Sequence, residues 1–174
     1  MKTLEESMVC KRKTCEKNRE AWNEAMIYHQ KARNNSLQKG FKNPNFSTFD
    51  RDCDSILIEK LNEIDLTDKI IAQLPCNNGR ELLSLMKFGA KKGIGFDISD
   101  VAISEAKELA TISNLNVEFH RTNILDMDDT FNNFFDFIYI SEGPLQWFSS
   151  LNNYFKVISK LLKPNGKIFY NKFI

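Results

Sequence analysis

The feature that most constrains the fold is the stretch from Ile70 to Asp97, in which two short apolar runs flank a helical pattern. The first run ends in a turn of small and polar residues at 75–79, and the helical pattern closes at Gly89. This order predicts a strand, a loop, a helix and a second strand that carries the carboxylate of Asp97 at its tip. Such a unit places a nucleoside over the carboxyl ends of two parallel strands, where Asp97 would accept hydrogen bonds from both ribose hydroxyls.

The chain after Asp97 continues to alternate between helical and extended patterns. Residues 134–141 form the most apolar strand pattern, which is expected at the centre of a sheet. Asp136 begins that strand, far from its carboxyl end, so we expect a structural role for it. The whole pattern predicts an α/β fold with a mostly parallel sheet of about five strands and helices on both faces. The expected helices are 50–62, capped by Asp50 or Asp52 and with Ile56, Leu57 and Leu61 inward, 99–113, capped by Ser99 or Asp100, and 149–162, capped by Ser149 or Ser150. A turn at 163–166 follows, with a positive backbone angle at Gly166.

The first 49 residues have a different character. Up to Asn35 they are charged and contain neither Pro nor Gly, and apolar residues recur at near-helical spacing. The segment predicts one long helix or two short ones, followed by a loop at 34–49. Three phenylalanines spaced through that loop are expected to pin it to the domain.

Composition excludes several classes of protein. The chain has 174 residues, enough for one domain with a core, and its net charge of +1 gives no reason to expect nucleic acid or a membrane surface as a partner. No apolar run approaches the ~18 residues that span a bilayer. The polar N-terminus lacks the pattern of a signal peptide, so a cytoplasmic protein is expected. The four cysteines lack metal-ligand spacing, and we expect no metal site.

In the order of its motifs, the chain from about Leu66 to Phe169 resembles the class I S-adenosylmethionine-dependent methyltransferases. The matching features are the strand and loop ending at Gly79, the acid Asp97, the Phe-Asp pair that opens the run at 134–141, and the Lys163-Pro164-Asn165-Gly166 turn before an apolar strand. The chain departs from the family in its first loop. The family usually has an acid where Gln73 stands and glycines where Pro75 and Asn77 stand. Asn tolerates left-handed backbone angles at modest cost, so Asn77 and Asn78 can substitute for glycine.

The resemblance implies a Rossmann-like three-layer sandwich, S-adenosylmethionine as cofactor, and in-line transfer of its methyl group to a small molecule. Residues 1–49 would form an N-terminal helical extension, or lid, and a loop, and residues 50–174 the methyltransferase domain. Asn123 would face the adenine amino group and Ile124 the adenine ring; the alternative for Asn123 is a helix or turn cap. The cofactor-binding residues implied are Gln73, Pro75, Cys76, Asn77, Asn78, Gly79, Asp97, Ile98, Asn123, Ile124 and Ser141.

The acceptor side is expected near residues 141–148 and under the N-terminal helix. Glu142 and His29 are the catalytic candidates, with Glu142 acting as a base or orienting an amine. The expected substrate-binding residues are Tyr28, His29, Glu142 and Trp147. The alternatives are that Trp147 is a core anchor, that Trp22 merely packs the helix on the domain, and that Tyr28 and His29 are surface residues.

The end of the chain and the loop departures raise further expectations. The family sheet usually carries seven strands, and this chain stops in or just after the fifth. Residues 167–173 are therefore expected at an uncovered sheet edge, where two copies could pair as a homodimer. A non-catalytic nucleoside-binding module is the alternative function. An NAD-dependent oxidoreductase is disfavoured, because the loop lacks the G-x-G-x-x-G pattern.

Overall fold

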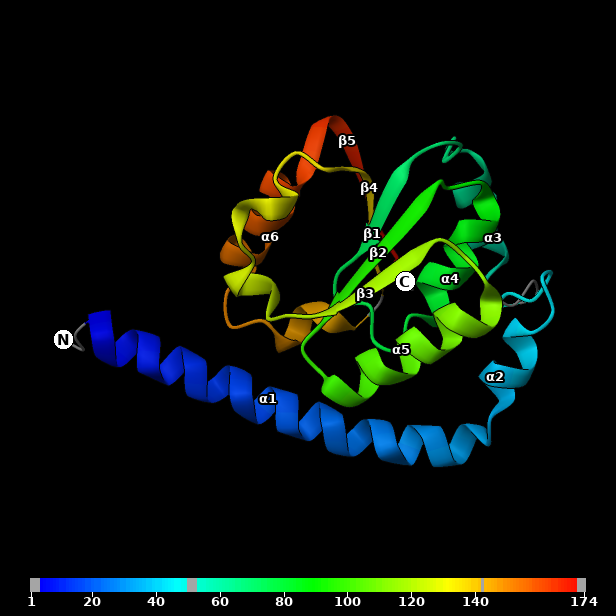
Figure 1. Cartoon of the computed structure of the whole chain (residues 1–174). Helices are drawn as coiled ribbons and strands as arrows, with labels where there is room; N and C mark the ends of the chain where they lie inside the picture. The colour runs from blue at the N-terminus through cyan, green and yellow to red at the C-terminus, as the bar shows by residue number, and fades with distance from the viewer. Residues whose placement is uncertain (1–3, 50–52, 142, 172–174) are drawn as a thin grey trace.

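The computed structural model describes residues 4–49, 53–141 and 143–171, with side chains from Lys13 onward. Five parallel strands form one sheet in the order β3-β2-β1-β4-β5 (Figure 1). The strands are β1 Ile70–Gln73, β2 Lys92–Asp97, β3 Val117–Arg121, β4 Phe135–Ile140 and β5 Leu162–Tyr170. The predicted α/β fold with a parallel sheet is confirmed. Because the strand order reverses between β1 and β4, the carboxyl ends of these strands flank the position where such sheets bind ligands.

Helices cover both faces of the sheet (Figure 1). α3, α4 and α5 pack on one face and α6 packs on the other. The helices are α1 Leu4–Arg33, α2 Ser36–Phe41, α3 Ser55–Asn62, α4 Arg80–Leu85, α5 Asp100–Ser113 and α6 Leu151–Leu161. Short 3-10 turns complete the chain: η1 Met86–Phe88, η2 Ile124–Asp126, η3 Asp129–Phe131 and η4 Pro144–Trp147.

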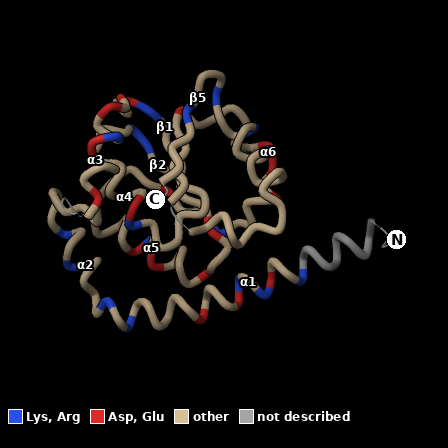
Figure 2. The backbone as a smooth tube through the Cα atoms, turned by 180° about the vertical axis from the view of Figure 1, so that it is seen from behind, with Lys and Arg blue, Asp and Glu red and all other residues tan. Residues whose placement is uncertain are grey.

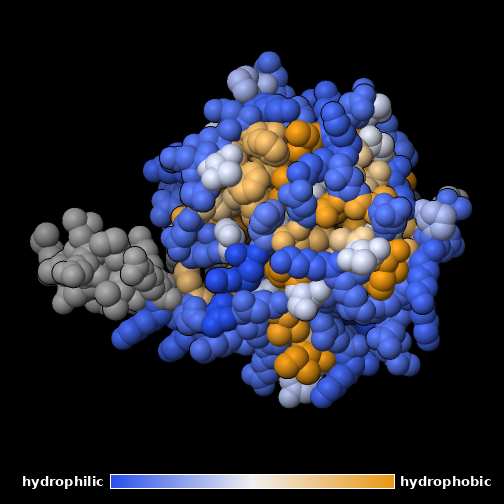
Figure 3. Space-filling view, viewed as in Figure 1, coloured by the Kyte–Doolittle hydropathy of each residue, from blue (hydrophilic) through white to orange (hydrophobic). Residues whose placement is uncertain are grey.

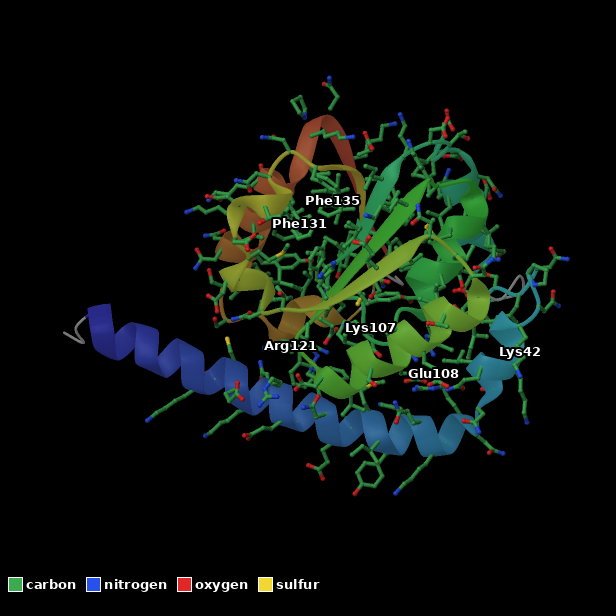
Figure 4. The ribbon with its side chains drawn as sticks, in the orientation of Figure 1. Lys42, Lys107, Glu108, Arg121, Phe131 and Phe135 are labelled. Carbon is green, nitrogen blue, oxygen red and sulfur yellow. The ribbon has the colours of Figure 1, made fainter. Side chains whose placement is uncertain are left out.

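The two-residue period of the strands divides the core into two clusters. In β1, Ile71 joins the cluster under α3, α4 and α5, whereas Ala72 joins the cluster under α6. The α6 side also holds Phe135, whose ring stacks on Phe131 at 5.9 Å between centroids. Figure 4 labels both residues, which lie near each other on this side. β4 is buried on both faces, as expected for a central strand.

Several local predictions are confirmed by hydrogen bonds. Ser99 caps α5 by accepting from Ala102 N at 3.1 Å, and Ser150 caps α6 by accepting from Asn153 N at 3.3 Å. Asp136 accepts from Ile70 N and from Lys163 Nζ, both at 2.9 Å, at the amino end of the sheet. Its role there is structural, because it ties three segments together far from the carboxyl ends.

Three local predictions are wrong. The segment 34–49 is not a loop throughout, because it contains helix α2. Ile56 does not face inward: its side chain is 74% exposed, because α3 packs on the domain through Leu57, Ile58 and Leu61. Asn165, at φ 65°, takes the positive backbone angle that was expected at Gly166. The reason is that β5 begins at Leu162, directly after α6, so the expected turn is an irregular start of the strand. Asp50 and Asp52, which were expected to cap α3, lie outside the described residues.

α1 is one long helix that lies along α5 (Figure 1). Met26 is 1% exposed at this contact, and Asn23 Oδ1 accepts from Ser99 Oγ at 2.7 Å. Arg33 pairs with Glu105 at 2.7 Å, and the Glu105 side chain is only 3% exposed. Acidic and basic positions are interspersed along the described part of α1 (Figure 2). These polar contacts fix the C-terminal half of α1 against the domain.

β5 lies at one edge of the sheet, next to β4 only. It exposes Ile168 (45%) and Tyr170 (41%). The expectation that this strand lies at an edge is therefore confirmed for its described residues. Within the described parts of the chain, every helix is too short or too polar to cross a membrane.

Candidate functional site

One pocket of about 320 Å³ lies at the carboxyl ends of β1, β2 and β4. Its opposite wall is α1. Figure 3 shows that hydrophilic residues, in blue, cover most of the face in view, with hydrophobic residues, in orange, between them. A volume of this order suits a small ligand. The pocket is lined by Thr14, Cys15, Asn18, Trp22, Pro75, Asn77, Asp97, Ile98, Thr122, Asn123, Ile124, Leu125, Ser141, Gly143, Pro144, Gln146, Trp147, Phe148 and Ser149.

The loop after β1 is folded back onto the end of β2. Cys76 N donates to Phe96 O at 2.8 Å, and Asn77 N donates to Asp97 Oδ2 at 2.8 Å. Asn77 adopts φ 50°, the left-handed angle expected for it as a glycine substitute, whereas Asn78 is not among the residues with positive φ. The loop therefore keeps a tight path although it has only one glycine.

That glycine is required by packing as well as by conformation. Gly79 has φ 74°, and a Cβ there would lie 2.3 Å from the Phe119 ring. Gly95 on β2 faces the same ring, with a Cβ distance of 2.6 Å. Because both positions lack side chains, Phe119 fits beneath the loop and the start of α4 approaches the sheet closely.

Asp97 stands at the carboxyl end of β2 and lines the pocket. It is only 8% exposed. Its two oxygens accept from Asn77 N at 2.8 Å and from Ser99 N at 2.9 Å. Burial raises the pKa of Asp97 above its usual value, and these backbone hydrogen bonds oppose the rise. The carboxylate is therefore held in one orientation by the backbone.

Asn123 and Ile124 form the neighbouring wall. Asn123 Oδ1 accepts from Leu125 N at 3.3 Å, so it caps η2, and its amide donates to Asp126 at 2.7 Å. Asn123 also lines the pocket, as does the buried Ile124. Asn123 can therefore cap the turn and still accept a hydrogen bond from an adenine amino group, because an amide oxygen has two lone pairs.

Two tryptophans meet across the mouth of the pocket. Trp22 of α1 and Trp147 of η4 pack edge to face with centroids 5.3 Å apart, and Asn18 donates to Trp147 O at 3.4 Å. Trp147 is 48% exposed, so it is not a core anchor. The contact joins the N-terminal helix to the segment after β4.

A second buried carboxyl group lies on the other side of the β1 end. Gln73 is 1% exposed, and its Nε2 donates to Glu81 Oε2 at 2.6 Å. The Ser141 hydroxyl is close enough to Glu81 to lower its pKa. Burial raises the pKa of Glu81, and the contacts with Gln73 and Ser141 oppose the rise. Since Ser141 also lines the pocket, Glu81 is one residue removed from it.

Comparisons with known proteins agree with this geometry. The sequence profile of the methyltransferase domain family matches residues 71–166. The chain belongs to this family. Over 129 residues it is 28% identical to a ribosomal protein L11 methyltransferase of Haemophilus influenzae, an alignment that covers 71% of this chain and 40% of that protein. An uncharacterized protein of Methanocaldococcus jannaschii is 38% identical over 69 residues, which are 40% of this chain and 32% of that protein.

Solved structures show the same fold. An S-adenosylmethionine-dependent methyltransferase from Mesorhizobium loti superimposes with a TM-score of 0.54 at 18% identity, over 64% of this chain and 50% of that chain. These findings support S-adenosylmethionine as the cofactor. The chain spans less than half of each of the two curated relatives named above.

The structure brings together many of the site residues expected from the sequence of this methyltransferase domain. Pro75, Asn77, Asp97, Ile98, Asn123, Ile124, Ser141 and Trp147 all line the pocket. Gln73, Cys76, Asn78 and Gly79 are buried and are not among its lining residues. Tyr28 is 64% exposed and His29 is exposed too; neither lines the pocket. Glu142 lies outside the described residues.

Sequence reasoning missed part of the wall. Cys15 and Asn18 line the pocket with Trp22. Their spacing of i, i+3 and i+7, continued by the buried Met26, marks one face of a helix, and this signal could have found them. Glu81 was also missed. The family usually has an acid at the position of Gln73, and Glu81 is the first acid that follows this position.

Two buried polar atoms near the pocket have no hydrogen-bond partner within the described part of the chain. They are Gln73 Oε1, an acceptor, and Asn78 Nδ2, a donor. Buried polar groups of native proteins are nearly always satisfied. Unused atoms of both kinds beside the Asp97 pocket fit the binding of a polar cofactor. Among residues 4–49, 53–141 and 143–171 we find no group of three or more His, Cys, Asp or Glu side chains that could hold a metal ion.

Proposed function

We propose that the pocket binds S-adenosylmethionine and that the chain transfers its methyl group to a small molecule. The observation that carries the proposal is Asp97, fixed at the tip of β2 and open to the pocket. A carboxylate offers about four lone-pair positions, and the backbone amides of Asn77 and Ser99 occupy two of them. Acceptor capacity therefore remains for ribose hydroxyls, which is the role expected of an acid at this position.

The adenine would lie between the segment at 122–125 and Ile98. Ile124 and Ile98 offer apolar surface for the ring, and the second lone pair of Asn123 Oδ1 can accept from the exocyclic amine. Apolar walls with a few polar groups are the usual composition of such sites. Pro75 and Asn77 would line the sugar and the start of the amino-acid end.

When bound, S-adenosylmethionine supplies a methyl group on a sulfonium, which is displaced in line by a nucleophile. The chain has to align the reactants and exclude water, and this alone can be worth several kcal/mol or more. Trp22 and Trp147 cover the mouth and would exclude water there. An aromatic face near the sulfonium would add roughly 0.5–2 kcal/mol. Aligning and covering the reactants requires no dedicated general base.

A small acceptor is supported by the enclosure of the pocket, since α1 and η4 close over the side opposite the sheet. The second candidate is a protein acceptor, because relatives include ribosomal protein L11 methyltransferases. Incubation with radiolabelled S-adenosylmethionine would separate the two. Label is expected in a small molecule that chromatography of the ultrafiltered cell extract separates from S-adenosylmethionine, and transferred label confined to the protein fraction would favour the second candidate.

Binding is tested first by calorimetry with S-adenosylmethionine, S-adenosylhomocysteine and NAD. We expect saturable binding of the first two and none of NAD. Absence of binding to either adenosyl compound would refute the proposal. Binding without methyl transfer to any acceptor would instead favour a non-catalytic binding module.

We further propose that residues 1–49 act as a lid through α1. The support is that Cys15, Asn18 and Trp22 form a pocket wall, while the C-terminal half of α1 is fixed to α5. Amide hydrogen exchange of residues 15–35 should slow when S-adenosylhomocysteine is added. Exchange that stays unchanged at saturating ligand would contradict a lid.

A further inference from the structure

The amino end of α5 is capped by two side chains, one local and one distant. The first amides of a helix have no partner within the helix. Ser99 Oγ accepts from Ala102 N at 3.1 Å, as a local cap does. Asn23 Oδ1, on α1, accepts from Val101 N at 3.3 Å, across 78 residues of the chain. A side chain of α1 therefore completes the cap of the helix that follows Asp97.

The same side chain is connected to the Asp97 carboxylate. Ser99 Oγ donates to Asn23 Oδ1 at 2.7 Å, and Ser99 N donates to Asp97 Oδ1 at 2.9 Å. Ser99 is buried, so water does not readily replace its partners. Two hydrogen bonds in series, both made by Ser99, thus join α1 to the carboxylate at the tip of β2.

The nitrogen of the Asn23 amide makes a more exposed contact. Asn23 Nδ2 donates to Asp100 Oδ2 at 3.1 Å. Arg19 of α1 donates to the same oxygen, and Nε of Arg121, which Figure 4 labels, lies 3.6 Å from Asp100 Oδ1. The Asp100 side chain is 47% exposed, and ion pairs at such positions contribute little free energy. Since the nitrogen of Asn23 faces this carboxylate, its oxygen is directed at Ser99.

Asn23 also adjoins the wall that α1 gives to the pocket. It directly follows Trp22, which lines the pocket together with Asn18 and Cys15. The support of Asp97 and the pocket wall therefore meet at this one residue of α1.

We propose that Asn23 is a positioning residue of the ribose site. From α1 it holds Ser99, and through the Ser99 amide it holds the Asp97 carboxylate in the orientation that accepts ribose hydroxyls. The proposal rests on the proposed function, which assigns the ribose to Asp97. It adds that the docking of α1 and the binding of a ribose are coupled, so each favours the other by the same free energy.

The test compares wild type with Asn23→Leu, which keeps the approximate size of the side chain and removes both ends of the amide. Adenosine and 2′,3′-dideoxyadenosine are titrated by calorimetry, each to concentrations above its dissociation constant. The second compound lacks the hydroxyls that Asp97 would bind. Asn23→Leu should weaken adenosine about three- to tenfold, the net value of roughly one hydrogen bond, and leave 2′,3′-dideoxyadenosine unchanged.

The possible failures are distinguishable. Equal weakening of both nucleosides would show a purely structural role and would overturn the proposal, as would unchanged binding of both. The proposed function would stand in either case. If wild type bound neither S-adenosylhomocysteine nor adenosine, the proposed function would fail, and this proposal with it.

Gln30→Leu is the matched control for the docking of α1. Gln30 Nε2 donates to Glu105 at 3.3 Å, so this variant removes another hydrogen bond between the same two helices, while Glu105 keeps Arg33. Both nucleosides should bind it as they bind wild type. Equal effects of Gln30→Leu and Asn23→Leu would mean that any loosened contact of α1 disturbs the site, and would overturn the role of Asn23.

Asn23→Asp separates the two ends of the amide. Its carboxylate can still accept from Ser99 and Val101, but it cannot donate to Asp100. This variant should retain most of the wild-type affinity for adenosine. A loss as large as that of Asn23→Leu would place the effect at Asp100 and contradict the proposed link through Ser99.

Discussion

Two buried acids, Asp97 and Glu81, stand on neighbouring parts of the same sheet end and are held in different ways. Asp97 accepts from two backbone amides, while Glu81 accepts from the side-chain amide of Gln73. Burial raises the pKa of both groups. Backbone donors are fixed by the fold, so the Asp97 site is preorganised by the chain path of the loop and the start of α5. The Glu81 site depends on which side chains stand at Gln73 and Ser141, and it can change without changing the fold.

The largest expected effect is on the Asp97 side. Asp97→Ala should weaken S-adenosylmethionine binding roughly ten- to a hundredfold, because hydrogen bonds to a charged acceptor are worth about 1.5–3 kcal/mol. Calorimetry measures this directly. Asp128→Asn, which changes an exposed acid at η3, is the matched control and should bind like wild type. If Asp97→Ala kept wild-type affinity, the assignment of the ribose site would be wrong.

A smaller effect is expected from the aromatic contact across the mouth, which touches neither acid. Trp22→Ala should weaken cofactor binding by about two- to tenfold, since an aromatic pair is worth roughly 0.5–1.5 kcal/mol beyond its buried area. Tyr28→Ala removes an exposed aromatic residue from the same helix and should leave affinity unchanged. Equal losses in both variants would show that α1 acts through its stability rather than through this contact.

The pH dependence of stability sharpens the contrast between the acids. A carboxyl group whose folded pKa is raised contributes more stability below its unfolded pKa, and that contribution is lost as pH rises through the folded value. The unliganded protein at neutral pH therefore carries a cost at Glu81, which faces Gln73, Ser141, Arg80, Asp54 and Tyr139.

Glu81→Gln should accordingly raise the free energy of unfolding of the unliganded protein at pH 7 relative to wild type, and the difference should shrink as pH falls toward the unfolded pKa of a glutamate. Urea denaturation at several pH values measures it. A variant less stable than wild type at pH 7 would mean that the charge of Glu81 is compensated in the free protein.

Much of the fold was predictable because it rests on local signals. Ser99 and Ser150 cap their helices where the pattern begins, and the nearly continuous apolar run of β4 marks a central strand. Asp97 was predictable for the same reason, since an acid that follows a strand needs no tertiary information to be placed at the strand end. The position of Asn77 at a left-handed angle followed from its residue type.

The rest of the site depends on how distant segments pack. The face of α1 that carries Cys15 and Trp22 becomes a pocket wall only because Asn23 and Arg33 fix the helix to α5. Tyr28 and His29 also carry side chains that could contact a substrate, and they stand on the same helix. They lie on its exposed face. Glu81 joins Gln73 only through the turn into α4. The sequence alone shows which side chains are present, but it does not show which of them the packing of distant segments brings together.

The smallest expected effect on cofactor binding concerns the β5 edge, which adjoins the Glu81 side of the sheet and not the Asp97 side. Asn171, just after β5, donates to the Tyr139 hydroxyl at 3.3 Å, and Ile168 and Tyr170 are exposed on the edge strand. Because an unpaired edge invites pairing between chains, we propose a homodimer through β5.

Light scattering should show a mass that rises with concentration for wild type and stays that of a monomer for Ile168→Lys. Ile56→Lys changes another exposed isoleucine, on α3, and should dimerise like wild type. Affinity for S-adenosylmethionine should be the same in all three proteins, because Asp97 lies on β2, three strands away from β5 in the sheet order. A concentration-independent wild-type monomer would refute the dimer. A loss of affinity in Ile168→Lys alone would show that the part of the site near Glu81 depends on dimerisation through β5. The surroundings of Glu81 and Asp97 would then differ in their dependence on the dimer as well as in their hydrogen bonds.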